Sequence, residues 1–95
     1  MKTRRPKTKL AVRGKTYRDE AGIKKFGARV KEIRKAKNIT QEELVHKTGF
    51  DLSQIGRIER GLINTSLSHV LRLAECLGVS PTELFIFPQE AKKGK

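Results

Sequence analysis

The chain has 95 residues, enough for one domain with a modest hydrophobic core, and its formal net charge of +12 predicts a polyanionic partner. No apolar run approaches the roughly 20 residues that span a bilayer, so the sequence favours nucleic acid over a membrane as that partner. The single cysteine, Cys76, cannot form an internal disulfide, which suits a reducing cytoplasm.

The positive charge is concentrated at the start of the chain. Residues 1–39 carry fifteen basic and three acidic side chains, whereas the remaining residues carry seven of each. Residues 1–18 have neither a helical nor a strand period, so we expect a flexible basic arm there. Such arms can enter the minor groove of DNA, and the candidate contacts are Arg4, Arg5, Lys7 and Lys9. A solvated tail without a role in DNA binding is the alternative.

A first helix is predicted from near Asp19 to about Lys37. Apolar side chains recur there at spacings of three, four and three residues, the period of one helical face, and they are Ile23, Phe26, Val30 and Ile33. Asn38 is suited to the left-handed conformation that ends many helices. Gly22 and Gly27 each weaken this helix by about 1 kcal/mol relative to alanine.

Two shorter helices follow, and each begins at a candidate cap. Thr40 and Glu43 have the spacing of a capping box, which opens a helix over about 41–48. Asp51 is placed to cap the next helix, over about 52–60.

Two further helices are predicted in the C-terminal part of the chain. Ser66 is placed to cap a helix whose apolar face comprises Leu67, Val70, Leu71, Ala74 and Leu77. The segment Ser80–Glu83 combines a capping box with a proline at the first helical position, which opens a short helix ending near Phe85. The sequence therefore predicts an all-α domain of five helices over residues 19–88, followed by a basic tail over 89–95.

Only three residues, Gly49, Phe50 and Asp51, separate the second and third predicted helices. A three- to four-residue turn containing glycine, between helices that cross at roughly 90–120°, is the geometry of a helix-turn-helix. Gly49 permits the positive φ that such a reversal requires. Phe50 is expected to pack between the two helices, which would approach each other closely at Val45 and Ile55.

From Phe26 to about Phe85 the chain resembles the phage-repressor and Cro type of helix-turn-helix domain, the XRE family. The resemblance rests on residues in a fixed order, and these are Arg34, Thr40-Gln41-Glu42-Glu43-Leu44, Gly49, Ile55, Ile58-Glu59-Arg60-Gly61, Asn64, Leu73-Ala74, Leu77-Gly78-Val79-Ser80 and Glu83-Leu84-Phe85. Each mark is common alone, but the set at this spacing is specific. It implies a lambda-repressor-like fold and binding to double-stranded DNA.

The resemblance also implies which residues touch DNA. Base edges in the major groove would be contacted by Leu52, Ser53 and Arg57. Arg57 is the strongest of these candidates because a guanidinium can bond O6 and N7 of guanine together. A second group would contact phosphates, and it comprises Arg34, Thr40, Gln41, Arg60 and Asn64. Arg34 would also form a structural ion pair with Glu59. Ordinary solvated charges are the alternative for Arg57 and Arg60.

Gly56 departs from the family pattern, because this position usually holds a polar or larger residue. The glycine either lets the helix approach the groove closely or only weakens the helix by about 1 kcal/mol. The base-contacting face is also poor in hydrogen-bonding side chains. We therefore expect part of the specificity to come from the shape of the DNA.

The apolar segment at the end of the predicted domain indicates an interface. Phe85 is expected to pack inside, whereas Ile86 and Phe87 are expected at the surface, where apolar patches often mark contacts between proteins. Because repressor-type domains bind two half-sites as symmetric dimers, we expect a homodimer formed through the last two predicted helices and the segment Phe85, Ile86 and Phe87. The alternative is that Phe87 folds back onto its own domain.

Together these features predict a cytoplasmic transcriptional regulator, a repressor or a controller protein, of bacterial or phage origin. The alternative is an antitoxin or adaptor that uses the same fold mainly to hold a protein partner. We expect no enzymatic activity and no cofactor or metal, because no catalytic set of residues is evident and His46, His69 and Cys76 lack zinc-ligand spacing. Both histidines are expected at the surface, and Cys76 is expected to be buried.

Overall fold

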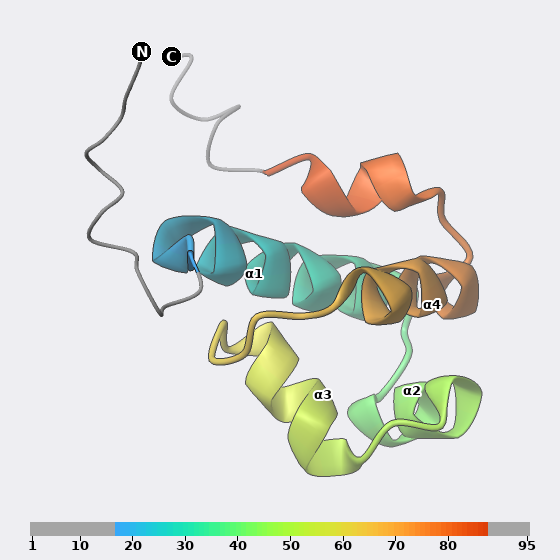
Figure 1. Ribbon diagram of the computed structural model, residues 1–95. Helices are drawn as coiled ribbons and strands as arrows, with labels where there is room; N and C mark the ends of the chain where they lie inside the picture. Colours follow the sequence, from blue (N-terminus) through green and yellow to red (C-terminus); the bar gives the residue numbers. More distant parts are fainter. Residues whose placement is uncertain (1–16, 88–95) are drawn as a thin grey trace, which may run out of the picture.

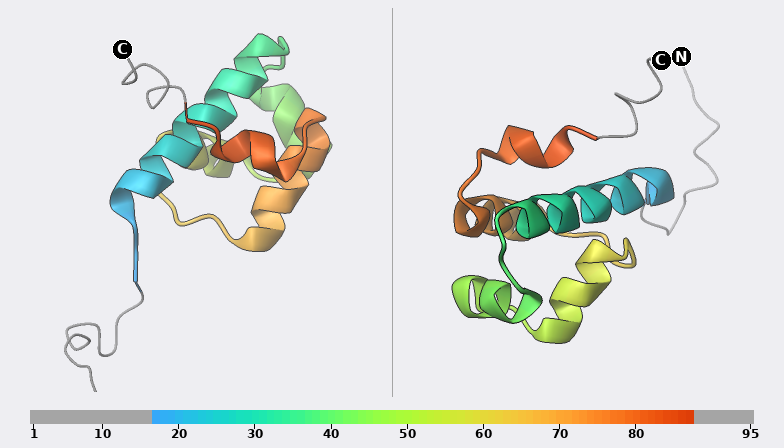
Figure 2. Two further views of the ribbon diagram at one scale, coloured as in Figure 1. Left: turned by 90° about the horizontal axis from the view of Figure 1, so that it is seen from above. Right: turned by 180° about the vertical axis from the view of Figure 1, so that it is seen from behind.

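The computed structural model describes residues 17–87, and the elements within that range are all helical. They are α1 (Glu20–Ala36), α2 (Gln41–Thr48), α3 (Leu52–Glu59), α4 (Leu67–Leu77) and the 3₁₀ helix η2 (Pro81–Phe85). The pair α2 and α3 lies on one side of α1 and α4, and η2 lies on the other side (Figures 1 and 2). The predicted all-α class is confirmed for this part of the chain.

The fifth predicted helix is a 3₁₀ helix rather than an α-helix. Ser80 makes no side-chain capping hydrogen bond, so the predicted capping box is wrong. Instead the backbone N–H of Glu83 donates to the carbonyl of Ser80 at 3.0 Å, a bond of the i to i+3 kind. The segment is only five residues long, which leaves little room for the wider turn of an α-helix.

Most of the other predicted helix ends are confirmed. The Asp19 carboxylate accepts from the Gly22 N–H at 2.9 Å, and Ser66 caps α4 through the His69 N–H at 3.2 Å. Asn38 has a φ of 59°, as expected for a left-handed stop. The predicted side-chain cap at Asp51 is wrong, because its backbone is extended but its carboxylate makes no capping bond.

One hydrophobic core joins all five elements. Its members are buried side chains, namely Phe26, Val30, Ile33, Leu44, Ile55, Ile58, Val70, Leu73, Ala74, Leu77 and Leu84.

The predicted apolar face of α4 is wrong at Leu67 and Leu71, which are 72% and 48% exposed, while Leu73 is fully buried. The reason is that α4 is covered by α2 and by η2, so its buried face is turned toward Leu73. At the end of η2, Leu84 is buried and Phe85 is 52% exposed, the reverse of the prediction for Phe85.

Gly27 sets how closely α1 and α3 approach. A Cβ atom at this position would lie 2.2 Å from the carbonyl oxygen of Ile58 and 2.9 Å from that of Glu59, both backbone atoms. No side chain fits between the two helices at this point. The glycine that weakens α1 as an isolated helix is therefore the residue that lets α3 pack against it.

Among residues 17–87, no helix combines the length and apolar character needed to cross a membrane. The same residues contain no group of three or more His, Cys, Asp or Glu side chains arranged to hold a metal ion.

Candidate nucleic-acid interface

The turn between α2 and α3 has the geometry that the sequence predicts. Gly49 ends α2 in the left-handed conformation with a φ of 84°, and its N–H donates to the carbonyl of Val45 at 2.7 Å. Phe50 is partly buried against the core, with its ring centroid 4.5 Å from that of His69. The turn is therefore fixed by backbone geometry on one side and by apolar packing on the other.

The outer face of α3 is open to solvent. Leu52 is 46% exposed, and Ser53 and Arg57 are also exposed, so the three predicted base-contacting residues lie on one uncovered face. Ile55 and Ile58 anchor the opposite face at 1% exposure each. A helix held from behind in this way can present its outer side to a groove without losing its position in the domain.

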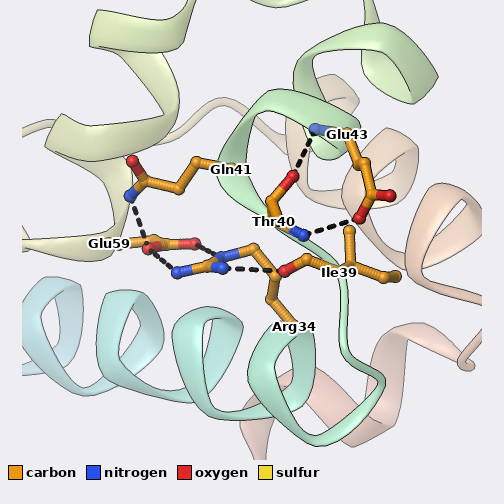
Figure 3. A network of polar contacts seen from close by, with 6 residues as sticks. All are labelled: Arg34, Ile39, Thr40, Gln41, Glu43 and Glu59. Atoms are coloured by element: carbon orange, nitrogen blue, oxygen red, sulfur yellow. Dashed lines mark hydrogen bonds and ion pairs between the residues drawn. The ribbon is translucent and has the colours of Figure 1, made fainter.

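A buried polar network holds α3 in place at its C-terminal end (Figure 3). The Nε atom of Arg34 donates to Glu59 Oε2 at 2.6 Å, and Nη2 donates to Oε1 at 3.1 Å. Gln41 Nε2 donates to the same Oε1 atom at 2.9 Å, and Arg34 Nη1 donates to the carbonyl of Ile39 at 2.8 Å. One carboxylate thus joins the end of α1, the start of α2 and the end of α3.

The hydrogen bonds of this network limit the roles that are open to Arg34. The residue is only 7% exposed, and all three guanidinium nitrogens donate to protein acceptors. A guanidinium that is buried and bonded at each nitrogen is poorly placed for the phosphate contact predicted for Arg34. The geometry favours the other predicted role, a structural ion pair with Glu59 that fixes the angle between the helices.

The N-terminus of α2 is a candidate anion-binding position. Both bonds of the capping box are present, since Thr40 Oγ1 accepts from the Glu43 N–H at 3.0 Å and the Glu43 carboxylate accepts from the Thr40 N–H at 2.8 Å. The N–H groups of Gln41 and Glu42 lie in the first turn, where a helix offers no internal acceptor. Thr40 is exposed and Gln41 is half-buried, so this end of the helix is accessible from outside.

Two more of the predicted phosphate contacts lie at the surface just beyond α3. Arg60 and Asn64 are both exposed. Close to them, Arg18 Nη2 donates to the carbonyl of Leu62 at 3.0 Å, which holds the start of the described chain against the loop after α3. The predicted arm contacts Arg4, Arg5, Lys7 and Lys9, and the basic tail 89–95, lie outside the described residues.

The predicted dimer segment lies on the far side of α1 from α3 (Figure 1). Phe85 and Ile86 are each 52% exposed, whereas Phe87 is half-buried, with its ring 6.5 Å from that of Phe85 and 5.9 Å from Lys25 Nζ. Beside these rings is a mainly apolar groove of about 550 Å³. Its wall also includes Ile23, Phe26, Ile63, Leu67 and Val70.

Two predictions about single side chains are wrong. His69 was expected at the surface, but it is partly buried between the Phe50 ring and the Gln54 amide, whose Nε2 is 3.2 Å from His69 Nδ1. Cys76 was expected to be buried, but it is half-buried and its Sγ donates to the carbonyl of Lys47 at 3.2 Å. Neither contact has a local sequence signal, because each joins residues at least 15 positions apart.

The short turn, the buried network and the open face of α3 define a helix-turn-helix domain. The chain belongs to the helix-turn-helix family, whose model matches residues 30–84, and the predicted family is thereby confirmed. A relative from Bacillus amyloliquefaciens, Control protein C.BamHI, is 38% identical over 63 residues, which cover 65% of this chain and 78% of the relative.

Solved structures support the same assignment. The restriction-modification controller protein C.AhdI from Aeromonas hydrophila has 46% sequence identity and a TM-score of 0.66, over 68% of this chain and 98% of that one. The controller protein C.Esp1396I, solved as a tetramer in complex with its natural 35 base-pair operator, has 30% identity and a TM-score of 0.66. That match covers 70% of this chain and 88% of C.Esp1396I.

Proposed function

We propose that this protein is a sequence-specific transcriptional regulator of the controller or repressor type, which binds double-stranded DNA as a homodimer and places α3 in the major groove. The observation that carries the proposal is the open outer face of α3, held from behind by two fully buried isoleucines. Relatives named as controller proteins and transcriptional regulators support it, and one of them is described on its operator. The protein acts by binding rather than by catalysis, in the cytoplasm and on bacterial or phage DNA.

Direct contacts with bases come from the exposed side chains of α3. Arg57 donates two hydrogen bonds to O6 and N7 of a guanine. Ser53 makes a weaker polar contact, and Leu52 packs against a thymine methyl group. With one strong hydrogen-bonding group in this set, the shape and stiffness of the operator contribute part of the specificity.

Contacts with phosphates position α3 in the groove. The N-terminus of α2, with Thr40 and Gln41, accepts a phosphate through its free N–H groups and the positive end of the helix dipole. Asn64 contacts the backbone on the far side of α3. Arg34 acts indirectly, because its bonds to Glu59 hold the end of α3 at a fixed distance from α2.

The basic arm adds affinity that does not depend on sequence. The bond between Arg18 and the carbonyl of Leu62 supports this role, because it holds the first described residues beside the loop that follows α3. From there Arg4, Arg5, Lys7 and Lys9 reach neighbouring phosphates or the minor groove.

The dimer forms through the apolar segment Phe85, Ile86 and Phe87. The exposure of Phe85 and Ile86 supports an interface here, because large apolar side chains at a surface favour association. Sedimentation of Phe87→Asp tests the interface, with Ser68→Asp as a control on an exposed position of α4. We expect the first variant to sediment as a monomer and the second as a dimer; a Phe87→Asp dimer of unchanged mass would remove this residue from the interface.

An adaptor or antitoxin role is the second candidate function. The apolar groove beside Phe85 and Phe87 favours it, because a partner's side chains would find an apolar site there. The two functions differ in what the purified protein does alone. A regulator selects one sequence from a pool of random duplexes, and the selected site has two half-sites in inverted orientation. Failure to enrich any sequence would contradict the proposed function and favour the adaptor.

A further inference from the structure

Gly56 is a buried residue on a helix face that is otherwise open. It lies next to Ser53 and Arg57, yet it is almost inaccessible to solvent. The nearest side-chain atoms to this position belong to Arg60. A Cβ placed on Gly56 would lie 3.0 Å from Nη1, 3.8 Å from Cζ and 4.0 Å from Nη2 of Arg60. The end of the Arg60 guanidinium, with Nη1 nearest, therefore lies where a larger residue at position 56 would carry its side chain.

The direction of the Arg60 side chain follows from helix geometry. Arg60 is the C-cap of α3 and keeps helical backbone angles, with φ −86° and ψ −1°. Side chains on a helix point back toward its N-terminus, so a residue at i+4 lies over residue i. Seven residues before Arg60, Ser53 lies on the same stripe of the helix. The guanidinium thus points along the base-contacting face rather than outward from the end of the helix.

The chemistry of this guanidinium also differs from that of the other arginines nearby. Arg34 has all its nitrogens engaged, and Arg18 and Arg72 donate to backbone carbonyls. Within residues 17–87, no side-chain hydrogen bond or ion pair involves Arg57 or Arg60. The outer face of α3 therefore carries two arginines whose donors have no protein acceptor in the described structure.

We propose that Gly56 is a platform that holds the Arg60 guanidinium on the base-contacting face, and that Arg60 is a second specificity-determining residue. This inference rests on the proposed DNA-binding function and changes the role of Arg60 from a phosphate contact to a base contact. The ligand it recognises is a guanine in the major groove, because a guanidinium on this face can donate two N–H groups to O6 and N7 together. The base-contacting face, predicted to be poor in hydrogen-bonding side chains, then has two arginines in place of one.

The proposal gives the glycine a function that opposes its effect on stability. Alanine is a better helix former than glycine, so Gly56→Ala raises the stability of α3. The nearest atoms to the new methyl group are the flexible end of Arg60 and not backbone, so the guanidinium moves away at little cost. We expect the melting temperature to rise by about 4–8 °C. We also expect affinity for the preferred duplex to fall by about 5- to 20-fold, at the lower end of the range for a bidentate contact.

A double-mutant cycle tests whether the effect passes through Arg60. The probes are the duplex that the wild-type protein selects from a random pool and an unrelated duplex of the same length, at one fixed salt concentration. Arg60→Ala should weaken binding to the selected duplex by about 5- to 150-fold and remove the preference at one base pair. In the Arg60→Ala background, Gly56→Ala should have no further effect on affinity but should still raise the melting temperature.

Arg60→Lys separates a base contact from a phosphate contact. Lysine keeps the charge but cannot make the bidentate pair, so this variant should bind the unrelated duplex as the wild type does while losing the base preference. The inference would be overturned if Gly56→Ala bound the selected duplex as tightly as the wild type. It would also be overturned if Arg60→Ala weakened both duplexes equally, which is the signature of a phosphate contact. If the wild type itself selects no sequence, the proposed function fails, and this inference fails with it.

Discussion

On its inner side α3 ends at Glu59, whose carboxylate holds both Arg34 and Gln41, whereas on its outer side the Arg57 guanidinium has no protein acceptor within residues 17–87. The two arginines carry the same charge but lie in different surroundings. A buried guanidinium with every nitrogen bonded fixes the geometry of a helix, and an exposed one with free donors can meet a ligand. The comparison shows that exposure and bonding, rather than residue type, separate the residues that build this site from those that bind with it.

The largest effect is expected when the Glu59 carboxylate, which bonds both Arg34 and Gln41, is removed. Glu59→Ala leaves the Arg34 guanidinium buried without its counter-charge, and we expect the free energy of unfolding to fall by about 3–5 kcal/mol. Urea titration followed by circular dichroism measures the loss. Glu42→Ala is the matched control, because Glu42 is exposed on the neighbouring helix, and its effect should stay within about 0.5 kcal/mol. Equal effects of the two variants would show that the network does not hold the fold.

A second test concerns the contact that places the inner side of α3 against α1. The Cβ of Gly27→Ala would lie 2.2 Å from a backbone oxygen, so the two helices must separate. We expect a loss of about 1–3 kcal/mol in the free energy of unfolding, despite the better helix propensity of alanine.

The matched control for Gly27→Ala is a glycine substitution in α3. Gly56→Ala adds the same methyl group against a flexible side chain, and it should stabilise the fold. Changes of the same sign in the two variants would contradict the close approach at Gly27.

The sequence predicts the elements of this fold better than their contacts. Caps and turns are local, so Thr40 with Glu43, Asn38 and Gly49 could be predicted from residues within a few positions of each other. The buried face of α4 could not, because the periodicity of its apolar residues permits either Leu71 or Leu73, and the choice depends on where α2 and η2 pack.

The candidate site likewise has a part that the sequence predicts and a part that depends on packing. The exposed face of α3 follows from its helical period, since Ile55 and Ile58 fix which side is buried. The bond between Gln41 and Glu59 and the approach of Arg60 to Gly56 depend on side-chain directions that the helical period does not give. A glycine has no side chain from which its packing partners could be predicted. From the sequence, Gly27 therefore indicates only a weaker α1 and not a close approach of α3.

On the outer side of α3, Arg57→Ala should affect binding and leave the fold intact. We expect affinity for the selected duplex to fall by about 1–3 kcal/mol and the preference at one base position to relax, because one bidentate contact is lost. The free energy of unfolding should change by no more than about 0.5 kcal/mol, since the side chain is exposed. Titration by fluorescence anisotropy on duplexes substituted at each position measures the first effect, and urea titration measures the second. A variant that keeps every base preference would contradict the assignment of the base-contacting face.

The smallest effect on specificity is expected from the arm. Deleting residues 1–16 keeps the bond of Arg18 to Leu62 but removes seven basic side chains, so binding to all duplexes should weaken by a similar factor. The slope of log affinity against log salt concentration should flatten by about 0.9 for each phosphate contact that is lost. The ratio of affinities for the selected and unrelated duplexes should stay constant, because the contacts of α3 with bases remain. If that ratio fell instead, the arm would be contacting bases, and the separation between a base-contacting helix and a charge-contributing arm would no longer describe this protein.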